Sequence, residues 1–415
     1  MPSRTVTLLT LAVGTLIAGT NSINGAIAKV EGDKIILGSS ISLTGKHSTK
    51  GINVTNGYNL AVKMINEVGG VRVGGKSFKL KIKFYDDSSS LEHATQMMER
   101  LIRHDRIKFM LGPYGAASTL ALAPITEKYK IPLVEAGAPS HALLTQGYKY
   151  LFTVSSTSRQ YFSSVISLAA EVAVKNGKNP HHLRLALIFE NDPFSLEVRT
   201  GVVDEVSKFG MNIVISELLP HNFSSVSATL TKIRAARPDL LLLSWRSRGG
   251  FTAARQFKKM KSYVPMIAMI DCEETRVIAK LGALANGILC PTQWARSLKY
   301  KDDIFGTAAE YDNLFTTTFK GYRKAPIQAV QATAAVMVWK EAFERANSFE
   351  IEKVRTALAA TNLNTFYGSI KFSPQGNNFA KPMVLRQIQN GELHVVAPSR
   401  YSTHRIRWPR RGSEL

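Results

Sequence analysis

The sequence is short of cysteine and of long apolar runs. Its 415 residues include two cysteines, Cys272 and Cys290, too few for a disulfide scaffold or a four-thiolate zinc site. No interior stretch reaches about 18 consecutive apolar residues, which excludes a membrane transporter. Because 45% of residues are hydrophobic and 20% are charged, the composition is that of a globular protein. The length predicts roughly two or three domains.

Acidic residues are also scarce. The chain has 31 Asp and Glu against 53 Lys and Arg, which gives a net charge of +22. Basic segments at 79–84, 255–261 and 400–411 would suit a nucleic-acid binder, but no helix-turn-helix, zinc-finger or aromatic RNA-binding signature accompanies them. We therefore expect no nucleic-acid partner and interpret the charge as a solvated basic surface with a basic tail at 399–415. Attraction to an acidic membrane surface stays open.

The N-terminal residues 1–28 have the order of a secretory signal peptide. Arg4 is followed by an apolar run at 6–18 and by Ala26-Ile27-Ala28, a small-x-small cleavage site. The alternative is a membrane anchor, but glycine interrupts the run, which is short for spanning. We expect an exported chain that starts at Lys29. Export permits a disulfide between the two cysteines, and two buried free thiols are an equally good interpretation.

Beyond this leader, short β-branched or Leu-rich runs alternate with stretches of helical period. Segments 34–42 and 78–87 are predicted strands on either side of a helix at 57–68. Ser89 with Glu92 three residues later is typical of a capping box. This βαβα order predicts a parallel sheet with helices on both faces.

The same rhythm restarts at 183–192, whose continuous apolar run is typical of a strand buried on both sides. After residue 289 the chain is mostly helical and then extended, which predicts that it crosses back and forth between two lobes. The predicted fold is α/β, with a central parallel sheet in each lobe. The expected lobes are 29–157 plus about 290–365 for lobe 1, and 158–289 plus about 366–398 for lobe 2.

Motifs of nucleotide binding and catalysis are missing or misplaced. Residues 70–77, GVRVGGKS, match the phosphate-loop pattern, but that chemistry needs a strand before the loop and a helix after it. Here the predicted order is reversed, so we interpret the segment as a helix-to-strand turn. GxSxG, HExxH and CxxC are absent, and the nine His residues are scattered. We expect no catalytic residue, no metal, no cofactor and no enzymatic activity.

Two loops of small residues follow neighbouring strands of the predicted first lobe. The loop in 111–124 leads into a helix, whose first turn offers unpaired N–H donors and a partial positive charge suited to a carboxylate. The next strand ends in EAGAPSH, 135–141. A tight turn capped by Ser118 is the alternative, but ligands of open α/β sheets bind beyond the carboxyl ends of strands. The candidate ligand-binding residues here are Tyr114, Gly115, Ala116, Ser118, Thr119, Gly137, Ala138 and Pro139.

The predicted second lobe places different chemistry at its strand ends. Phe194 and Trp245 are candidates for sandwiching an apolar group. Arg246 is a candidate partner for a carboxylate, and Asp271 or Glu273 for an ammonium group. Each residue alone also fits an ordinary loop, and their shared sheet edge is the reason for grouping them.

The order of these features resembles the periplasmic ligand-binding proteins of branched-chain amino acid ABC transporters, which have the type I periplasmic binding fold. The resemblance implies two Rossmann-like lobes joined by three crossings, which close on a small-molecule ligand in the periplasm and deliver it to an inner-membrane ABC permease. It covers nearly the whole mature chain. The segments that carry it are ILGSSISLTGKHSTKG with GYNLAVKMINEVGGV, YDDSSS, LGPYGAAST, IPLVEAGAPS, LLTQGYKYLF, ALIFENDPF and RPDLLLLSW.

The resemblance also implies roles for the candidate residues. The carboxylate-binding loop of the family matches Tyr114 to Thr119, and the second first-lobe loop matches Ala136 to Ser140. In the second lobe, Phe194 matches the aromatic residue that covers the ligand, Trp245 or Arg246 matches the second cover residue, and Asp271 or Glu273 matches the acid that binds the ammonium group.

Two departures from the family pattern bear on the ligand. Ala116 stands where amino-acid binders usually have a hydroxyl, and Pro139 stands near a usual Thr. Because these changes remove polar anchors, an aromatic or aliphatic carboxylate or an amide competes with a hydrophobic or branched-chain amino acid as the expected ligand. The disulfide common in first lobes of amino-acid binders is also absent. The competing functions are a ligand-sensing receptor domain of the same fold and a secreted hydrolase.

Overall fold

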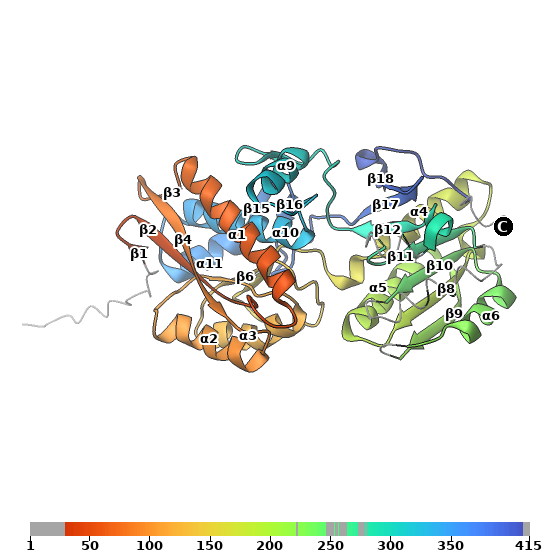
Figure 1. Ribbon diagram of the computed structural model, residues 1–415, viewed down its shortest axis with the longest axis horizontal. Coiled ribbons are helices and arrows are strands. Elements are labelled where there is room, and N and C mark those ends of the chain that lie inside the picture. Colours follow the sequence, from red (N-terminus) through yellow and green to blue (C-terminus); the bar gives the residue numbers. More distant parts are fainter. Residues whose placement is uncertain are drawn as a thin grey trace, which may run out of the picture.

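The computed structural model describes residues 30–409, apart from 221–222, 246–252, 254–255, 257–263, 273–278 and 280. Two separate seven-stranded sheets organise this part of the chain, each with helices packed on it, and they form two lobes that lie side by side (Figure 1). The predicted fold class, α/β with two lobes built on parallel sheets, is confirmed. The predicted leader and the residues after 409 lie outside the described part.

The first lobe takes its elements from two separate stretches of the chain. Its sheet has the order β3-β4-β2-β5-β6-β7, and β1 also pairs with β2. The central strands are parallel, while β1 pairs antiparallel with β2 and β3 pairs antiparallel with β4. The elements are β1 (Val30–Glu31), β2 (Lys34–Ile41), α1 (Ser48–Glu67), β3 (Val71–Val73), β4 (Lys76–Asp86), α2 (Leu91–Arg103), β5 (Met110–Leu111), α3 (Ala116–Lys128), β6 (Leu133–Glu135) and β7 (Leu151–Thr153), and later β13 (Lys301–Asp302), β14 (Gly306–Thr307), α9 (Ala308–Thr318), α10 (Ile327–Ala346), α11 (Ile351–Ala359), β15 (Asn362–Thr365) and β16 (Gly368–Lys371).

The two faces of this first sheet bury different helices. Ile35 and Leu37 of β2 belong to a core shared with α1 and α10, whereas Ile36 belongs to a core shared with α2 and α3. Successive side chains of a strand point to opposite faces, so this short apolar run is buried on both sides. Figure 1 shows α2 and α3 along the lower side of this lobe. The prediction of a sheet covered on both faces is thus confirmed for β2.

The second lobe repeats this plan with a different strand order. Its sheet runs β18-β17-β12-β11-β10-β8-β9. Strands β8 to β12 are parallel, whereas β17 pairs antiparallel with both β12 and β18. The elements are η1 (Ser158–Gln160), α4 (Ser163–Lys175), η2 (Pro180–His182), β8 (Arg184–Glu190), α5 (Pro193–Phe209), β9 (Asn212–Leu219), α6 (Ser227–Ala236), β10 (Leu240–Ser244), β11 (Met266–Met269), η3 (Gly282–Ala285), β12 (Leu289–Thr292), β17 (Val384–Gln389), β18 (Glu392–Ala397) and η4 (Ser399–Tyr401).

Three chain segments connect the lobes: one after β7, one after β12 and one between β16 and β17. Ser156, in the first connection, is fully buried and bonds to both of the others. Its backbone N–H donates to Oε1 of Gln293, directly after β12, over 2.8 Å. Its hydroxyl donates to the carbonyl oxygen of Lys381 in the third connection, over 3.0 Å. The expected lobe boundary near residue 290 lies inside β12, and the one near 365 lies between β15 and β16, so both crossings come a few residues later.

The segment GVRVGGKS forms a β-hairpin. β3 and β4 pair antiparallel with Val73 opposite Lys76, and Gly74 and Gly75 both have positive φ. Two central residues with positive φ define a type I′ turn, which glycine favours. The segment leads into a strand and opens no helix, which agrees with the interpretation as a turn and not as a phosphate loop.

The predicted capping box at Ser89 and Glu92 is wrong, because the N-cap is the next residue, Ser90. Ser90 is the N-cap of α2, and its side chain accepts a hydrogen bond from the N–H of His93. Ser89 has a left-handed backbone conformation with φ of 59°, so it belongs to the turn after β4.

Candidate functional site

A cavity of about 420 Å³, the inner cavity, lies between the lobes. Small-molecule sites usually enclose about 300–1,000 Å³, so its size suits an organic ligand. Both lobes and the connection after β12 contribute to its lining. The predicted site residues that line it are Tyr114, Gly115, Ala116, Gly137, Pro139, Phe194 and Asp271.

The remaining predicted residues lie elsewhere. Ser118, Thr119, Ala138 and Trp245 do not line the inner cavity. Trp245 is 5% exposed and packs in a core of the second lobe, with its ring 6.0 Å from that of Phe223. Arg246 and Glu273 lie outside the described residues.

The first-lobe wall begins where α3 starts. Gly115, the N-cap, has a φ of 91°, a conformation that favours glycine. Thr119 is fully buried, and its N–H and hydroxyl both donate to the carbonyl oxygen of Gly115. The hydroxyl predicted as a ligand donor is therefore engaged in the helix. The N–H groups of Ala116 and Ala117, which both line the cavity, precede the first intrahelical bond, so they can donate to an acceptor atom of a ligand.

The loop after β6 has fewer free hydrogen-bond donors than its sequence predicts. The N–H of Gly137 donates to the carboxylate of Glu135 at the end of β6. Pro139 has no N–H, and the Ser140 hydroxyl donates to Glu197 over 2.8 Å. Burial raises the pKa of Glu135 to about 7, even though the N–H groups of Ala138 and Gly137 and the Thr153 hydroxyl favour its charged form.

Glu197 of α5 links the two lobes beside the inner cavity, which it also lines. Its carboxylate accepts hydrogen bonds from the Ser140 hydroxyl and from the N–H groups of His141 and Ala142, over 2.8 to 2.9 Å. It also accepts from the hydroxyl of Ser158. Four donors on one carboxylate leave little capacity for a ligand. Sequence reasoning missed this residue, because nothing local distinguishes it from an exposed helix position.

The second-lobe wall is aromatic. Tyr161 and Phe194 meet edge to face, with ring centroids 5.1 Å apart and planes at 88°, a favourable arrangement of two rings. Asp192 fixes the start of α5, because its Oδ1 accepts from the N–H groups of Phe194 and Ser195. The expected covering position of Phe194 is consistent with this placement, while Tyr161 was missed.

Two buried side-chain amides line the inner cavity, one from the connection after β12 and one from α10. Gln293 and Gln331 both line it, and both are at least nine-tenths buried. Nε2 of Gln293 also donates to the Tyr161 hydroxyl over 3.3 Å. Sequence reasoning missed these residues. Gln328 and Gln331, three apart in the largely apolar first half of α10, were a signal that one stripe of that helix faces something polar.

Asp271 sits at the rim of the second lobe beside a covalent cross-link. Cys272, the next residue, is joined to Cys290 of β12 by a disulfide, with Cα atoms 5.6 Å apart. Both cysteines are fully buried. Of the two interpretations left open by the sequence, the structure therefore has the disulfide.

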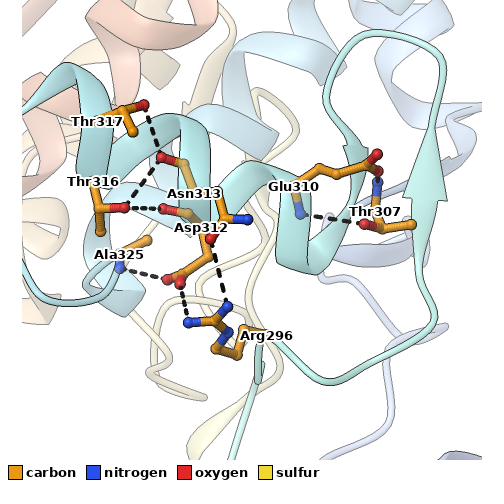
Figure 2. Close-up of polar contacts among 8 residues, drawn as sticks. All are labelled: Arg296, Thr307, Glu310, Asp312, Asn313, Thr316, Thr317 and Ala325. Carbon is orange, nitrogen blue, oxygen red and sulfur yellow. Dashed lines mark hydrogen bonds and ion pairs between the residues drawn. The ribbon is translucent and has the colours of Figure 1, made fainter.

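The inner cavity continues into a second cleft, the outer cleft, of about 880 Å³, with which it shares Tyr114, Asp271, Ile327 and Gln328. On its wall Arg296 pairs with the buried carboxylate of Asp312 over 3.0 Å. Asp312 also accepts from the N–H of Ala325 over 2.7 Å, as Figure 2 shows. These bonds fix the segment that leads into α10, and with it the start of the helix that carries Gln331.

In the described part of the chain, no group of three or more His, Cys, Asp or Glu side chains is arranged to hold a metal ion. In the same ranges, no helix is long and apolar enough to cross a bilayer.

Comparison with known proteins gives a consistent family. The family model described as periplasmic binding protein matches residues 34–392. Leu/Ile/Val-binding protein homolog 7 of Brucella suis biovar 1 is 24% identical over 421 residues, which cover 97% of this chain and 99% of the relative. Among solved structures, a putative branched-chain amino acid ABC transporter from Silicibacter pomeroyi superposes with a TM-score of 0.79 at 17% identity, covering 91% of this chain and 99% of its own. The branched-chain amino acid transporter substrate binding protein LivJ from Streptococcus pneumoniae, in complex with isoleucine, gives 0.69 at 18% identity, with 88% and 100% covered. None of these proteins is named as an enzyme. The chain therefore belongs to the periplasmic binding protein family.

Proposed function

We propose that the protein captures a small organic ligand in the periplasm by closing its two lobes on it, and that it delivers the ligand unchanged to an ABC permease in the inner membrane. The observation that carries the proposal is the inner cavity, whose walls come from both lobes. A ligand held by both walls stabilises the closed arrangement over the open one, and a difference in affinity of a few kcal/mol is enough to shift that equilibrium.

The lining gives the ligand an apolar body and a small polar head. Leu120, Phe194 and Ile327 supply apolar surface from both lobes. The first turn of α3 supplies hydrogen-bond donors, and the carbonyl oxygen of the Gln331 side chain supplies an acceptor. A hydrophobic or branched-chain amino acid, or a related carboxylate or amide, has this shape. The isoleucine bound by the Streptococcus pneumoniae neighbour is such a molecule.

A two-part experiment tests capture. Small-angle scattering with and without each compound of a panel of branched-chain and aromatic amino acids, aromatic acids and amides is expected to show compaction with at least one compound. Mass spectrometry of that compound after incubation is expected to return it unaltered. Scattering profiles that superimpose for the whole panel, or a chemically altered compound, would contradict the proposal.

A separate measurement tests export. Expression of the full chain in a Gram-negative host and intact-mass analysis of the periplasmic fraction is expected to give a protein that begins at Lys29. A product that retains residues 1–28 in the cytoplasm would remove the periplasmic assignment without touching the binding proposal.

A further inference from the structure

We infer that the inner cavity selects a primary amide, or another uncharged group with both a carbonyl oxygen and N–H donors, over a free carboxylate, and that Gln331 sets this preference. The inference rests on the proposed function, because it concerns the ligand of the same cavity. It is carried by the orientation of two buried side-chain amides and by the hydrogen-bond donors that a carboxylate would need.

The orientation of the Gln293 amide is fixed by one backbone unit. The N–H of Ser156 donates to Oε1 of Gln293 over 2.8 Å, and Nε2 of Gln293 donates to the carbonyl oxygen of Ser156 over 3.2 Å. A backbone N–H can only donate and a carbonyl can only accept. The amide of Gln293 therefore has a single orientation, and its Oε1 is an acceptor.

This fixed acceptor determines how Gln331 is oriented. Nε2 of Gln331 lies 3.3 Å from Oε1 of Gln293 and 3.4 Å from the hydroxyl oxygen of Tyr367. The Tyr367 hydroxyl gives its own proton to Oε1 of Gln293 over 2.8 Å, so it accepts from Gln331. Exchanging the oxygen and nitrogen of Gln331 would place two acceptors against each other at Gln293.

The remaining polar atom of the Gln331 amide is its carbonyl oxygen, Oε1. Gln331 is 6% exposed and lines the inner cavity, and in the described part of the protein this oxygen accepts no hydrogen bond. This oxygen therefore faces the cavity as an acceptor. A ligand that places an N–H group against Oε1 of Gln331 forms a hydrogen bond there, whereas a carboxylate has no proton to donate and would set one acceptor against another.

The usual partners of a carboxylate are missing or engaged. Ala116 and Pro139 offer no side-chain donor, and the donors of Gly137 and Ser140 are taken by Glu135 and Glu197. On the first-lobe side the described lining still offers the first turn of α3, the Tyr114 hydroxyl and Nε2 of Gln328, and these uncharged donors accommodate a carbonyl oxygen as well as a carboxylate.

The charges around the inner cavity act in the same direction. Its described lining includes Asp192 and Glu197, and no Lys or Arg. Nearby carboxylates disfavour a further negative charge. An α-amino acid supplies N–H donors for Gln331, but its carboxylate would rest on uncharged donors, close to these two acids. An amide places its carbonyl oxygen at α3 and its N–H groups at Gln331 without carrying a net negative charge.

Matched pairs of compounds test the inference. We would measure dissociation constants by calorimetry for isobutyramide and isobutyrate, benzamide and benzoate, and leucinamide and leucine, using the mature chain with its disulfide intact. In each pair the amide is expected to bind at least about tenfold more tightly. Gln331→Met, which removes the acceptor and keeps an unbranched side chain, is expected to reduce that ratio to near one.

Tyr367→Phe is the control for Gln331→Met, because it removes a neighbour of the amide network and leaves the acceptor in place. It is expected to change both members of a pair by the same factor. A tighter-binding carboxylate in each pair, or a ratio that survives Gln331→Met, would overturn the inference. Compaction with leucine or isoleucine but with none of the amides would also overturn it and leave the proposed function standing. If no compound of either kind binds or compacts the protein, both proposals fail.

Discussion

The carboxylate of Glu197, in the second lobe, accepts a hydrogen bond from the hydroxyl of Ser140, in the first lobe, over 2.8 Å. The N–H groups of the two residues after Ser140 donate to the same carboxylate. The lobes are thus joined beside the inner cavity by bonds that need no ligand. Such a link biases the relative position of the lobes before any ligand arrives.

We predict that Glu197→Gln opens the ligand-free protein and weakens binding about tenfold. The amide NH₂ that replaces one oxygen cannot accept from backbone N–H groups, and a smaller closed population lowers the apparent affinity in proportion. The radius of gyration and the dissociation constant are the two measurements. Glu205→Gln, on the same helix but paired with Lys208, is the matched control. An unchanged radius and affinity in Glu197→Gln would show that the link does not bias closure.

Phe194→Ala is expected to weaken ligand binding, whereas Trp245→Ala is expected to destabilise the fold. Phe194 lines the inner cavity, so its loss should weaken ligand binding by about 1–3 kcal/mol and change the free energy of unfolding little. Trp245 packs in a core, so its loss should lower the free energy of unfolding by about 3–5 kcal/mol. Calorimetry and urea denaturation separate the two effects. Weaker binding by a stably folded Trp245→Ala protein would favour the covering role expected from the sequence.

Glu135→Gln is expected to change how stability depends on pH. The folded-state pKa of Glu135 is raised from 4.5 to about 7, so its contribution to stability is fully present below pH 4.5 and is lost as the pH rises through 7. The variant cannot ionise, so it does not lose this contribution. The difference in free energy of unfolding between the variant and the natural protein should therefore grow by up to about 3 kcal/mol from pH 4.5 to pH 8.

Urea denaturation at several pH values measures this difference. Glu92→Gln, at an exposed position of α2, is the control and should follow the natural protein. A constant offset between Glu135→Gln and the natural protein from pH 4.5 to 8 would mean that folding does not raise the pKa of Glu135.

The disulfide between Cys272 and Cys290 is expected to contribute about 3 kcal/mol, because its two residues are 18 apart and closing a loop of this size restricts the unfolded chain by about that amount. Replacing both cysteines by serine should lower the free energy of unfolding accordingly. Reductant should destabilise the natural protein and leave the double variant unchanged. Equal stability of the natural protein with and without reductant would argue against the bond in solution.

The parts of the site that local patterns determine could be predicted. The loops at Tyr114 and Gly137, and Phe194 at the start of a helix, follow predicted strands, and the carboxyl ends of parallel strands share one sheet edge. Trp245 also follows a strand, but it continues the alternation of Leu241 and Leu243 and joins the same core. Its period-2 spacing from those residues was the signal that it points away from the cavity.

The residues that sequence reasoning missed depend on distant parts of the chain. The spacing of Gln331 from Gln328 on α10 indicates a polar stripe, but the partners of Gln331 appear only when the connections between the lobes bring Gln293 and Ser156 to it. Glu197 likewise gains its role from the loop at Ser140, 57 residues earlier in the chain. No periodicity within one element indicates such partners.

Ser156 holds the other two interlobe connections by its backbone N–H and its hydroxyl, and this has a mechanical consequence. In the proposed closure, three segments fastened at one buried point would turn together about a common axis, so that the lobes would rotate relative to each other without sliding apart. The amide of Gln293 is fastened at that same axis and in turn orients Gln331. A molecule that engages Gln331 therefore acts at the centre of the rotation, where a small displacement produces the widest swing at the outer ends of the lobes.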